Sequence, residues 1–551
     1  MLSITLISFI LAIPIFAKKI SATVFSRIAA IVFVYSAVLT WNSLYYLPLS
    51  QGGVGLYSGL FHVTTITLGF QILLFMVGAI LQFGWAPSIY NQLNFGNSKV
   101  GIERSLNINP NFVHMNTIHE HSLIVLFSVL GGCILISSYN FVSMYMGIEL
   151  QSFAAYILCT LYRNSQSSTA AGLKYFLLGS LASAIILLGT AVIYAGTGIT
   201  NFEDLATLIS VGEMNSATNF VSLSIAGGIL LIGIGYIFKV GAAPLYNWSP
   251  DVYDGVPTVI TSWVSTMPKI GILVFLLNLS FIVTGYDISW YSTITGSVGS
   301  LYTTYAKPFQ TLLLVSSVLS FLVGSIVGLS QVRIKRLLTF STINHVGFLL
   351  LALAVSTEES VEAFAFYLIQ YSLTNVNTFL TLLAFGYMTK GILQNKSNVR
   401  EFVLLDDLKG QFYKNPLLVI SFAVSLFSMA GIPPLMGFFA KQMVLYSVSY
   451  SYSYISIVAI ITSVIGASYY LKIVQLMFFQ KDSANTTIQT DSSEEVQQPL
   501  VTTMHSSVIA VLTLIISLYL FDSSILLNAC HLLSLSPVSY THLTLPTSDL
   551  V

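Results

Sequence analysis

The 551-residue sequence is 55% hydrophobic and only 8% charged, and its mean hydropathy is +0.82. This composition excludes an ordinary soluble domain and indicates a membrane protein. Lys plus Arg and Asp plus Glu each number 21, so no overall charge points to nucleic acid as a partner.

The sequence lacks the usual cofactor and metal motifs. Its three cysteines, Cys133, Cys159 and Cys530, are far apart and form no CxxC pair, which argues against a zinc site or an iron–sulfur cluster. It contains neither a GxGxxG motif after a strand nor a GxxxxGK motif followed by Ser or Thr. We therefore expect no cofactor and no metal in this chain.

Apolar runs of about 20 residues are long enough to cross ~30 Å of hydrocarbon as α-helices. The sequence predicts an all-α polytopic membrane protein with about 14 transmembrane helices. The first run could mimic a signal peptide, but Lys18 and Lys19 follow it rather than precede it, which favours a retained span. The predicted spans are 2–17, 24–47, 60–84, 119–138, 140–161, 168–195, 219–246, 256–284, 309–330, 333–355, 361–388, 415–444, 453–479 and 503–529.

Lys and Arg residues are distributed unequally over the loops between these spans. The odd-numbered loops hold nearly all of them, whereas the even-numbered loops hold only Lys307 and collect acidic residues such as Glu203 and Glu358. The positive-inside rule therefore places the odd loops on the matrix or cytoplasmic side and both termini on the opposite side. The seventh loop is the exception, because it carries Asp251 and Asp254 and no Lys or Arg.

Two of the predicted spans are interrupted in corresponding places. The seventh contains Lys239-Val-Gly-Ala-Ala-Pro244, and the twelfth contains Gly431-Ile-Pro-Pro434. Because proline lacks an N–H and crowds the preceding turn, we expect helices 7 and 12 to break near these prolines. Each broken helix is the fourth in a set of five, helices 4–8 and 9–13. An odd number of spans per set makes the copies antiparallel, so the sequence predicts two inverted five-helix repeats.

The predicted organisation has five parts, and the polar stretches are read as peripheral. We expect 85–118 to be a long loop, 481–502 to be a flexible linker, and 539–548 to be a disordered tail or a sequence artefact. The parts are three N-terminal helices with a polar loop (1–118), a first repeat (119–284), a connecting loop (285–308), a second repeat (309–480), and a linker with the last helix and tail (481–551).

Ionisable residues lie inside several of the apolar spans. A lysine near the bilayer centre costs about 2.5–3.5 kcal/mol on insertion scales, and it usually lines a protein-filled or water-filled path. Burial makes a lysine release its proton more readily, and a nearby carboxylate opposes this release. Histidine exchanges a proton near neutral pH even without such effects of its surroundings. The series therefore favours proton movement, with Glu149 and Lys239 as a switching pair. Its members, called the ionisable series below, are Glu149, Lys239, Lys269, His345 and Lys441.

Structural alternatives remain open when only the residues are considered. Glu149 and one lysine could form a static ion pair, and His345 could be a buried histidine satisfied by hydrogen bonds. Lys174 and Glu362 lie nearer helix ends, where long side chains can reach the membrane interface. We therefore treat Lys174 as only a possible member of the proton path.

Three motifs resemble the antiporter-like membrane subunits of NADH:ubiquinone oxidoreductase, respiratory complex I. They are Met-Gly-Ile-Glu-Leu at 146–150, the run 238–258, and Gly-Ile-Pro-Pro-Leu-Met-Gly-Phe-Phe-Ala-Lys at 431–441. The resemblance covers roughly residues 1–530 and implies a non-redox, proton-translocating subunit of this enzyme. It also implies that the ionisable series is the proton path, and that Lys174 matches a lysine of the sixth helix.

The resemblance further implies partners and a location. The partners are the other membrane-arm subunits of complex I, including neighbouring antiporter-like subunits, together with lipids of the mitochondrial inner membrane. NADH and ubiquinone would react in other subunits. Two related antiporter-like subunits of complex I differ from this sequence. Chain 4 carries a glutamate at the position of Lys441, and chain 5 continues after its last span into a long lateral helix that is not seen here. The three initial helices, which animal versions lack, favour a fungal or similar mitochondrion.

Two other functions share these features. A subunit of a multi-subunit Na+/H+ antiporter carries the same lysine and break motifs, and it would exchange ions without electron transfer. A scaffold could retain the buried charges without conducting protons. The resemblance favours the complex I subunit over both.

Overall fold

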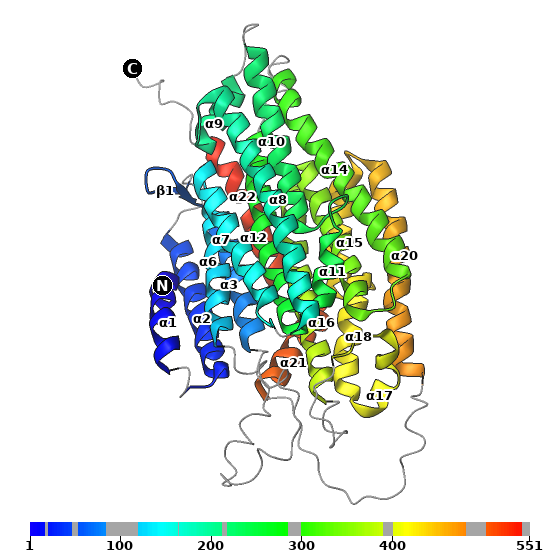
Figure 1. The fold of residues 1–551 in the computed structure, drawn as a ribbon. Helices are drawn as coiled ribbons and strands as arrows, with labels where there is room; N and C mark the ends of the chain where they lie inside the picture. Colours follow the sequence, from blue (N-terminus) through cyan, green and yellow to red (C-terminus); the bar gives the residue numbers. More distant parts are fainter. Residues whose placement is uncertain are drawn as a thin grey trace, which may run out of the picture.

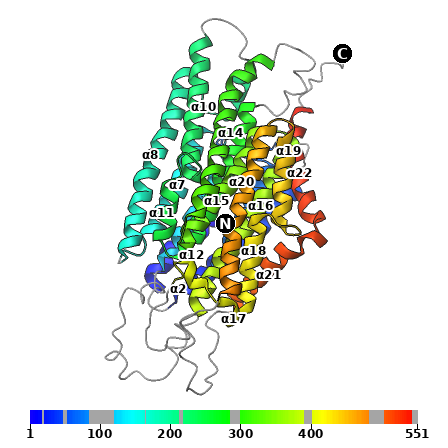
Figure 2. The same ribbon diagram turned by 90° about the vertical axis from the view of Figure 1, so that its right-hand side faces the viewer.

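The computed structural model describes residues 1–16, 20–46, 53–83, 119–163, 165–211, 218–284, 299–388, 401–480 and 503–542. Within these ranges the chain forms a bundle of long helices that run roughly parallel to one another (Figures 1 and 2). The strands in these ranges are β1 (Val54–Leu56) and β2 (Phe61–Val63), which form an antiparallel hairpin with Val54 opposite Val63. The predicted loop 85–118 and the linker 481–502 lie outside the described residues. The predicted connecting loop 285–308 and the predicted tail 539–548 were partly wrong, because residues 299–308 and 539–542 are helical. The remaining residues of both segments lie outside the described ranges.

Every predicted span coincides with helix, which confirms the predicted fold class. In the described part of the chain, eleven helices are long and apolar enough to cross a membrane by length and composition. The other three predicted spans are the short α1, the polar α16, and the broken pair α18 and α19. The spans are α1 (Leu2–Phe16), α2 (Ala22–Tyr46), α3 (Thr65–Phe83), α6 (Glu120–Ser137), α7 (Phe141–Thr160), α8 (Gln166–Thr197), α10 (Thr218–Val240) with α11 (Trp248–Gly255), α12 (Thr258–Thr284), α14 (Gly299–Leu329), α15 (Ile334–Val355), α16 (Glu358–Met388), α18 (Pro416–Ala430) with α19 (Met436–Ser449), α20 (Ser453–Phe479), and α21 (Thr503–Leu518) with α22 (Ser524–His542).

Several predicted boundaries were wrong. The third span begins at Thr65 rather than at residue 60, because the preceding residues form the hairpin. The fourteenth span is not one helix, since η6 (Tyr519–Phe521) separates α21 from α22. There the Ser524 hydroxyl donates to the Asp522 carboxylate at 3.1 Å, and such short polar side chains compete with helical backbone bonds. The remaining short elements are α9 (Phe202–Val211), η4 (Leu405–Leu408) and α17 (Gln411–Lys414).

The even-numbered loops are tied together at one end of the bundle. Asn140 caps α7 by accepting from the backbone N–H of Val142 at 2.9 Å, and its amide donates to the Asn201 side chain at 2.5 Å. The N–H of Phe202 donates to the Tyr139 carbonyl at 3.1 Å. We call this the even-loop end, and the opposite end, which α17 occupies in Figure 1, the odd-loop end.

The two predicted repeats pack in the same order. In each set the first helix packs on the second, the second on the third, the third on the fourth, and the fifth on the first. The fourth helix of each set is the broken pair, α10 with α11 in one set and α18 with α19 in the other. Because α6 runs toward the even-loop end and α14 runs away from it, the sets have opposite orientations (Figure 1).

Both interruptions have the same backbone pattern. Gly241 and Gly431 have φ angles of +78° and +85°, which glycine adopts without steric cost. The next residue in each break donates its N–H five residues back, Ala242 to Ile237 and Ile432 to Phe427, both at 3.1 Å. These bonds end α10 at Val240 and α18 at Ala430, at the two positions where the sequence predicted breaks in helices 7 and 12.

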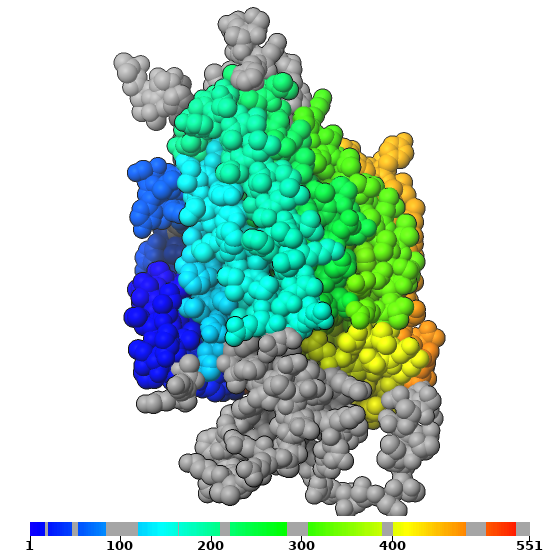
Figure 3. All heavy atoms as spheres, viewed as in Figure 1, coloured from blue at the N-terminus to red at the C-terminus, as the bar shows by residue number. Residues whose placement is uncertain are grey.

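Burial separates core helices from rim helices. In their most apolar stretches, 94% of α15 and 83% of α12 are buried, against 33% of α8 and α20 and 28% of α21. Figure 3 shows α8 spread across the front surface, with α1 and α2 at one edge and α20 at the other. Lys269 and His345 lie on these two most buried helices, α12 and α15. Lys441 of α19 contacts Phe348 of α15.

Candidate functional site

The ionisable series lies inside the protein and not on the lipid-facing surface. Lys239, Lys269, His345 and Lys441 are 8%, 2%, 2% and 9% exposed, and the Glu149 side chain is 15% exposed. The five residues come from α7, α10, α12, α15 and α19. None of the lysines reaches a membrane interface in the manner of a snorkelling side chain.

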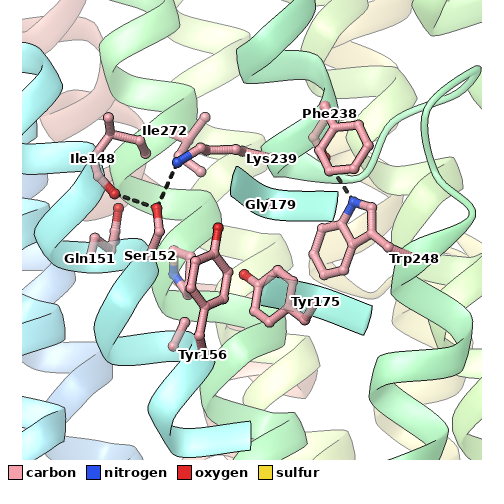
Figure 4. Close-up of a pocket in the computed structure, with 12 residues that line it drawn as sticks. Ile148, Gln151, Ser152, Tyr156, Tyr175, Gly179, Phe238, Lys239, Trp248 and Ile272 are labelled. Atoms are coloured by element: carbon pink, nitrogen blue, oxygen red, sulfur yellow. Dashed lines mark hydrogen bonds between the residues drawn. The ribbon is translucent and has the colours of Figure 1, made fainter. Parts of the chain in front are cut away.

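Lys239 of α10 contacts two residues of α7, Glu149 and Ser152. Its ammonium lies 3.3 Å from a Glu149 carboxylate oxygen. It also lies 2.7 Å from the Ser152 hydroxyl, a contact drawn in Figure 4. Ser152 follows Glu149 by three residues on α7, so both side chains face α10. The nearest partner of Lys239 is thus a neutral hydroxyl, and the carboxylate is the more distant one.

The break after Lys239 frees backbone carbonyls that other side chains satisfy. The Trp248 indole, at the start of α11, donates to the Phe238 carbonyl at 2.9 Å. Trp248 also stacks on Tyr175 of α8, with ring centres 4.6 Å apart. These contacts hold the interrupted backbone in place without using the Lys239 ammonium.

A small cavity adjoins Lys239. Its volume is about 10 Å³, enough for roughly one water centre. Residues of α7, α8, α10, α11 and α12 line it, including Ser152, Lys239 and Pro268 (Figure 4). The cavity therefore joins Lys239 to the part of α12 that contains Pro268, the residue before Lys269.

Lys269 follows a proline within α12 and contacts a threonine of the second repeat. Its ammonium donates to the Thr342 hydroxyl at 3.1 Å and lies 5.7 Å from the centre of the Tyr253 ring. Pro268 has no N–H for the Val264 carbonyl, which instead accepts from the Tyr253 hydroxyl at 3.4 Å.

Lys441 reaches back across the second break. Its ammonium donates to the Ala430 carbonyl at 2.8 Å, and this carbonyl belongs to the last turn of α18. It also lies 5.7 Å from the centre of the Phe348 ring. A Cβ added to Gly431 would come within 3.0 Å of the Lys441 side chain, so glycine also makes room for the lysine.

Helix α15 connects these contacts. Thr342, His345 and Phe348 follow one another at three-residue spacing, and they meet Lys269, two tyrosines and Lys441 respectively. At ~1.5 Å per residue, the contacts from Thr342 to Phe348 span about 9 Å along the helix. The structure thus brings Lys269, His345 and Lys441 together along α15. Lys239 contacts Glu149 and Ser152 of α7 instead.

The structure does not bring Lys174 into this arrangement. Its side chain is 41% exposed and forms an ion pair with Asp251 of α11. Asp251 and Asp254 also pair with Arg336 at 3.0 and 3.1 Å, and Asp254 pairs with Arg333. The acidic seventh loop therefore supplies the partners of basic residues from two other elements. We call these five residues the odd-loop charge cluster.

A neighbouring ion pair joins the same end of the bundle to the eleventh loop. Lys335 donates to Glu401 at 2.5 Å and to the Val256 carbonyl at 2.8 Å. The other Glu401 oxygen accepts from the Thr258 N–H and hydroxyl. Burial alone would raise the pKa of Glu401, but Lys335 and the Thr258 hydrogen bonds outweigh burial and hold it below its ordinary value.

Sequence reasoning missed the uncharged partners of the series. Ser152 could have been found from its three-residue spacing to Glu149 on one helix face. Thr342, Tyr367 and Tyr470 carry no comparable local signal, because they meet charged residues of other helices only after packing. The same holds for Phe348 and the Ala430 carbonyl.

Comparison with known proteins gives consistent matches over the chain. The family described as "NADH:quinone oxidoreductase/Mrp antiporter, TM" matches residues 138–311 and 298–466. The chain is 45% identical to NADH-ubiquinone oxidoreductase chain 2 of Rhizopus oryzae over 555 residues, covering 96% of this chain and 98% of that one.

Solved structures show that the fold is shared more widely. A chain of respiratory complex I from Thermus thermophilus with bound aureothin matches with a TM-score of 0.65 and 24% identity, covering 96% of this chain and 98% of that chain. A chain of the Mrp complex from Dietzia sp. DQ12-45-1b matches with a TM-score of 0.71 and 17% identity, covering 98% and 97%. At these identities the structural matches establish the fold alone. The family match and the Rhizopus relative together place this chain in the family of NADH:quinone oxidoreductase and Mrp antiporter membrane subunits, in its NADH-ubiquinone oxidoreductase chain 2 branch.

Proposed function

We propose that this chain is a proton-translocating membrane subunit of NADH:ubiquinone oxidoreductase, in the mitochondrial inner membrane. It assembles with other membrane-arm subunits, including neighbouring antiporter-like subunits, and it carries no redox cofactor of its own. NADH oxidation and ubiquinone reduction occur in other subunits, and this chain contributes to the translocase by moving protons. The similarity to the Rhizopus relative supports this assignment over a Na+/H+ antiporter.

One observation carries the proton-conducting role. Buried lysines and a histidine follow one another through the bundle, and Lys239, Lys269 and His345 each have a hydroxyl partner that can both accept and donate a hydrogen bond. The Ser152 and Thr342 hydroxyls accept from an ammonium and can also donate to a neutral amine. A proton can therefore leave either lysine without stranding an unpaired buried polar group.

Glu149 controls whether Lys239 keeps or releases its proton. While its carboxylate lies 3.3 Å from the ammonium, the positive charge is compensated. When the two separate, the lysine retains only the neutral Ser152 hydroxyl, and an uncompensated buried charge favours release of the proton. The cavity beside Lys239 and Pro268 offers room for the water that would carry this proton toward Lys269.

The test is proton transfer per electron in the assembled enzyme reconstituted into vesicles. Lys239→Ala should block proton pumping while the assembly still forms, and Glu149→Gln should impair it similarly. Glu149→Asp should be partly tolerated, because it keeps the charge. Lys409→Ala is the matched control, since Lys409 makes a surface pair with Asp406 at 2.7 Å.

The outcomes separate the candidate functions. Unchanged pumping in both Lys239→Ala and Glu149→Gln would reduce their pair to a structural ion bridge. The shared fold with the Mrp complex chain keeps a Na+/H+ antiporter subunit as the second candidate. That function would appear as sodium-dependent proton exchange in vesicles without any NADH oxidation.

A further inference from the structure

His345 has a tyrosine hydroxyl at each of its ring nitrogens. Nδ1 lies 2.8 Å from the Tyr367 hydroxyl, and Nε2 lies 3.4 Å from the Tyr470 hydroxyl. All three residues are at most 2% exposed. The Tyr470 hydroxyl also hydrogen-bonds the hydroxyl of Ser341, which precedes His345 by about one turn of α15. These contacts lie outside the series of lysines.

The two tyrosines meet the imidazole from different helices and at opposite ring nitrogens, close to the depth of His345 itself. Helix α16 begins at the even-loop end with Glu358, and Tyr367 lies about 14 Å along it. Helix α20 also begins at the even-loop end, but Tyr470 lies close to its other end, about 14 Å before Phe479. Ser341 is likewise on the odd-loop side of His345, because α15 begins there. Helices α16 and α20 therefore run in the same direction, and α15 runs antiparallel to both.

This geometry suits transfer of a proton past the ring. A neutral imidazole has one N–H and one free lone pair, and a tyrosine hydroxyl both donates and accepts. When Tyr470 gives its proton to Nε2, its oxygen takes the proton of the Ser341 hydroxyl, which a water molecule replaces. The imidazolium then gives the Nδ1 proton to Tyr367, whose own proton passes to a second water molecule. Every broken O–H bond is formed again, so one proton crosses and no tyrosine is left ionised.

We propose that Tyr470 and Tyr367 are the proton-relay residues of His345, with Tyr470 and Ser341 on the odd-loop side and Tyr367 on the even-loop side. His345 is then a crossing point between the lateral series of lysines and a route across the membrane. This inference rests on the proposed function, because it requires that the series conducts protons. The transfer also leaves the ring in its other tautomer, so the ring must reset before the next proton passes.

Tyr519 provides a control for a purely structural role. It is buried, at 4% exposed, and lies on η6. Its ring packs against Phe366 and Phe439, with ring centres 5.4 and 5.6 Å apart. Tyr519→Phe therefore removes a tyrosine hydroxyl from the protein interior without interrupting the contacts of His345.

The experiment measures coupled proton pumping per assembled enzyme in vesicles, together with its solvent deuterium isotope effect. Tyr470→Phe and Tyr367→Phe should each slow pumping roughly a hundredfold, the lower end of what a positioned proton donor contributes. The isotope effect should rise, because proton transfer becomes rate-limiting. Tyr519→Phe should behave like the wild type. Ser341→Ala is a smaller change that should also slow pumping. It tests the same relay if a tyrosine variant fails to assemble.

Each outcome has a distinct meaning. Wild-type pumping in Tyr470→Phe and Tyr367→Phe, while Lys239→Ala blocks it, would overturn the relay and leave the proposed function standing. Equal slowing in all three tyrosine variants would overturn it too, because it would show a general packing effect. Normal pumping in Lys239→Ala would instead defeat the proposed function itself.

Discussion

The three lysines of the ionisable series have neutral oxygen atoms as their nearest hydrogen-bond partners. Lys239 contacts the Ser152 hydroxyl at 2.7 Å, Lys269 the Thr342 hydroxyl at 3.1 Å, and Lys441 the Ala430 carbonyl at 2.8 Å. A carboxylate would hold each lysine in its charged form, whereas a neutral oxygen favours neither form strongly. Of these three lysines, only Lys239 also pairs with a carboxylate within the described residues. Under the proposed function, neutral partners are what we expect of lysines that exchange protons instead of forming static ion pairs.

We expect Ser152→Ala to slow coupled proton pumping roughly tenfold without abolishing it. The change removes a hydrogen bond to a charged group, worth about 1.5 kcal/mol, while Glu149 remains in place. Pumping in reconstituted vesicles is the measurement. Ser180→Ala is the control, because the exposed Ser180 hydroxyl donates only to the Leu177 carbonyl of its own helix. Equal rates in the two variants would contradict a role for Ser152.

At the scale of the helix, the two breaks share a backbone pattern but use different groups to satisfy the freed carbonyls. In the first break the Trp248 indole bonds the Phe238 carbonyl, and Lys239 lies before the interruption. In the second break Lys441, which lies after it, bonds the Ala430 carbonyl itself. The backbone of the second break therefore binds the Lys441 ammonium directly. The backbone of the first break is bound by Trp248, and Lys239 only lies next to it in sequence.

Two glycine substitutions distinguish these roles. Gly241→Ala and Gly431→Ala should each destabilise the protein by about 1–2 kcal/mol, because both positions have positive φ. Only Gly431→Ala should also slow proton pumping, since its methyl would come within 3.0 Å of the Lys441 side chain, against 3.4 Å from the Ser249 side chain at Gly241. Thermal unfolding of the assembled enzyme and its pumping rate are the two measurements. Equal pumping in both variants would show that Lys441 tolerates the shift.

At the scale of the whole molecule, the two repeats are joined both in the core and at the odd-loop end. In the core, Lys269 of the first repeat meets Thr342 of the second. At the odd-loop end, Arg336 of α15 binds both Asp251 and Asp254 of α11. Because α11 directly follows the broken helix of the first repeat, a movement of that break would be transmitted to α15, the helix that carries His345.

The odd-loop end should also make stability depend on pH. The pKa of Glu401 is lower in the folded protein than its ordinary value of 4.5, since Lys335 and Thr258 bind its charged form. Its contribution is therefore fully present above about pH 4.5 and is lost as the pH falls through the lower folded value. Glu401→Gln should reduce the unfolding temperature at about pH 7, and the difference from the wild type should shrink on acidification. A difference that stays constant with pH would contradict this.

The sequence alone determined the features that depend on local physics. Span number follows from the length of apolar runs, and the breaks at Gly241–Pro244 and Gly431–Pro434 follow from what proline and glycine do to a helix. Buried ionisable residues such as Lys269 could be identified because few charges interrupt the apolar runs. Local physics was insufficient where short polar residues compete with a helix, as in the unexpected break at 519–523.

Only the tertiary structure decided which groups meet. The Lys269–Thr342 contact joins residues 73 positions apart, and the Tyr470–His345 contact joins residues 125 positions apart. Serine, threonine and tyrosine are common in these helices, so composition cannot indicate which hydroxyl will face a lysine or a histidine. Likewise, Asp254 was an exception to the charge pattern until packing brought Arg333 and Arg336 to it. The partners are chosen by how helices pack, because a helix fixes which residues share its face and leaves open what that face will meet.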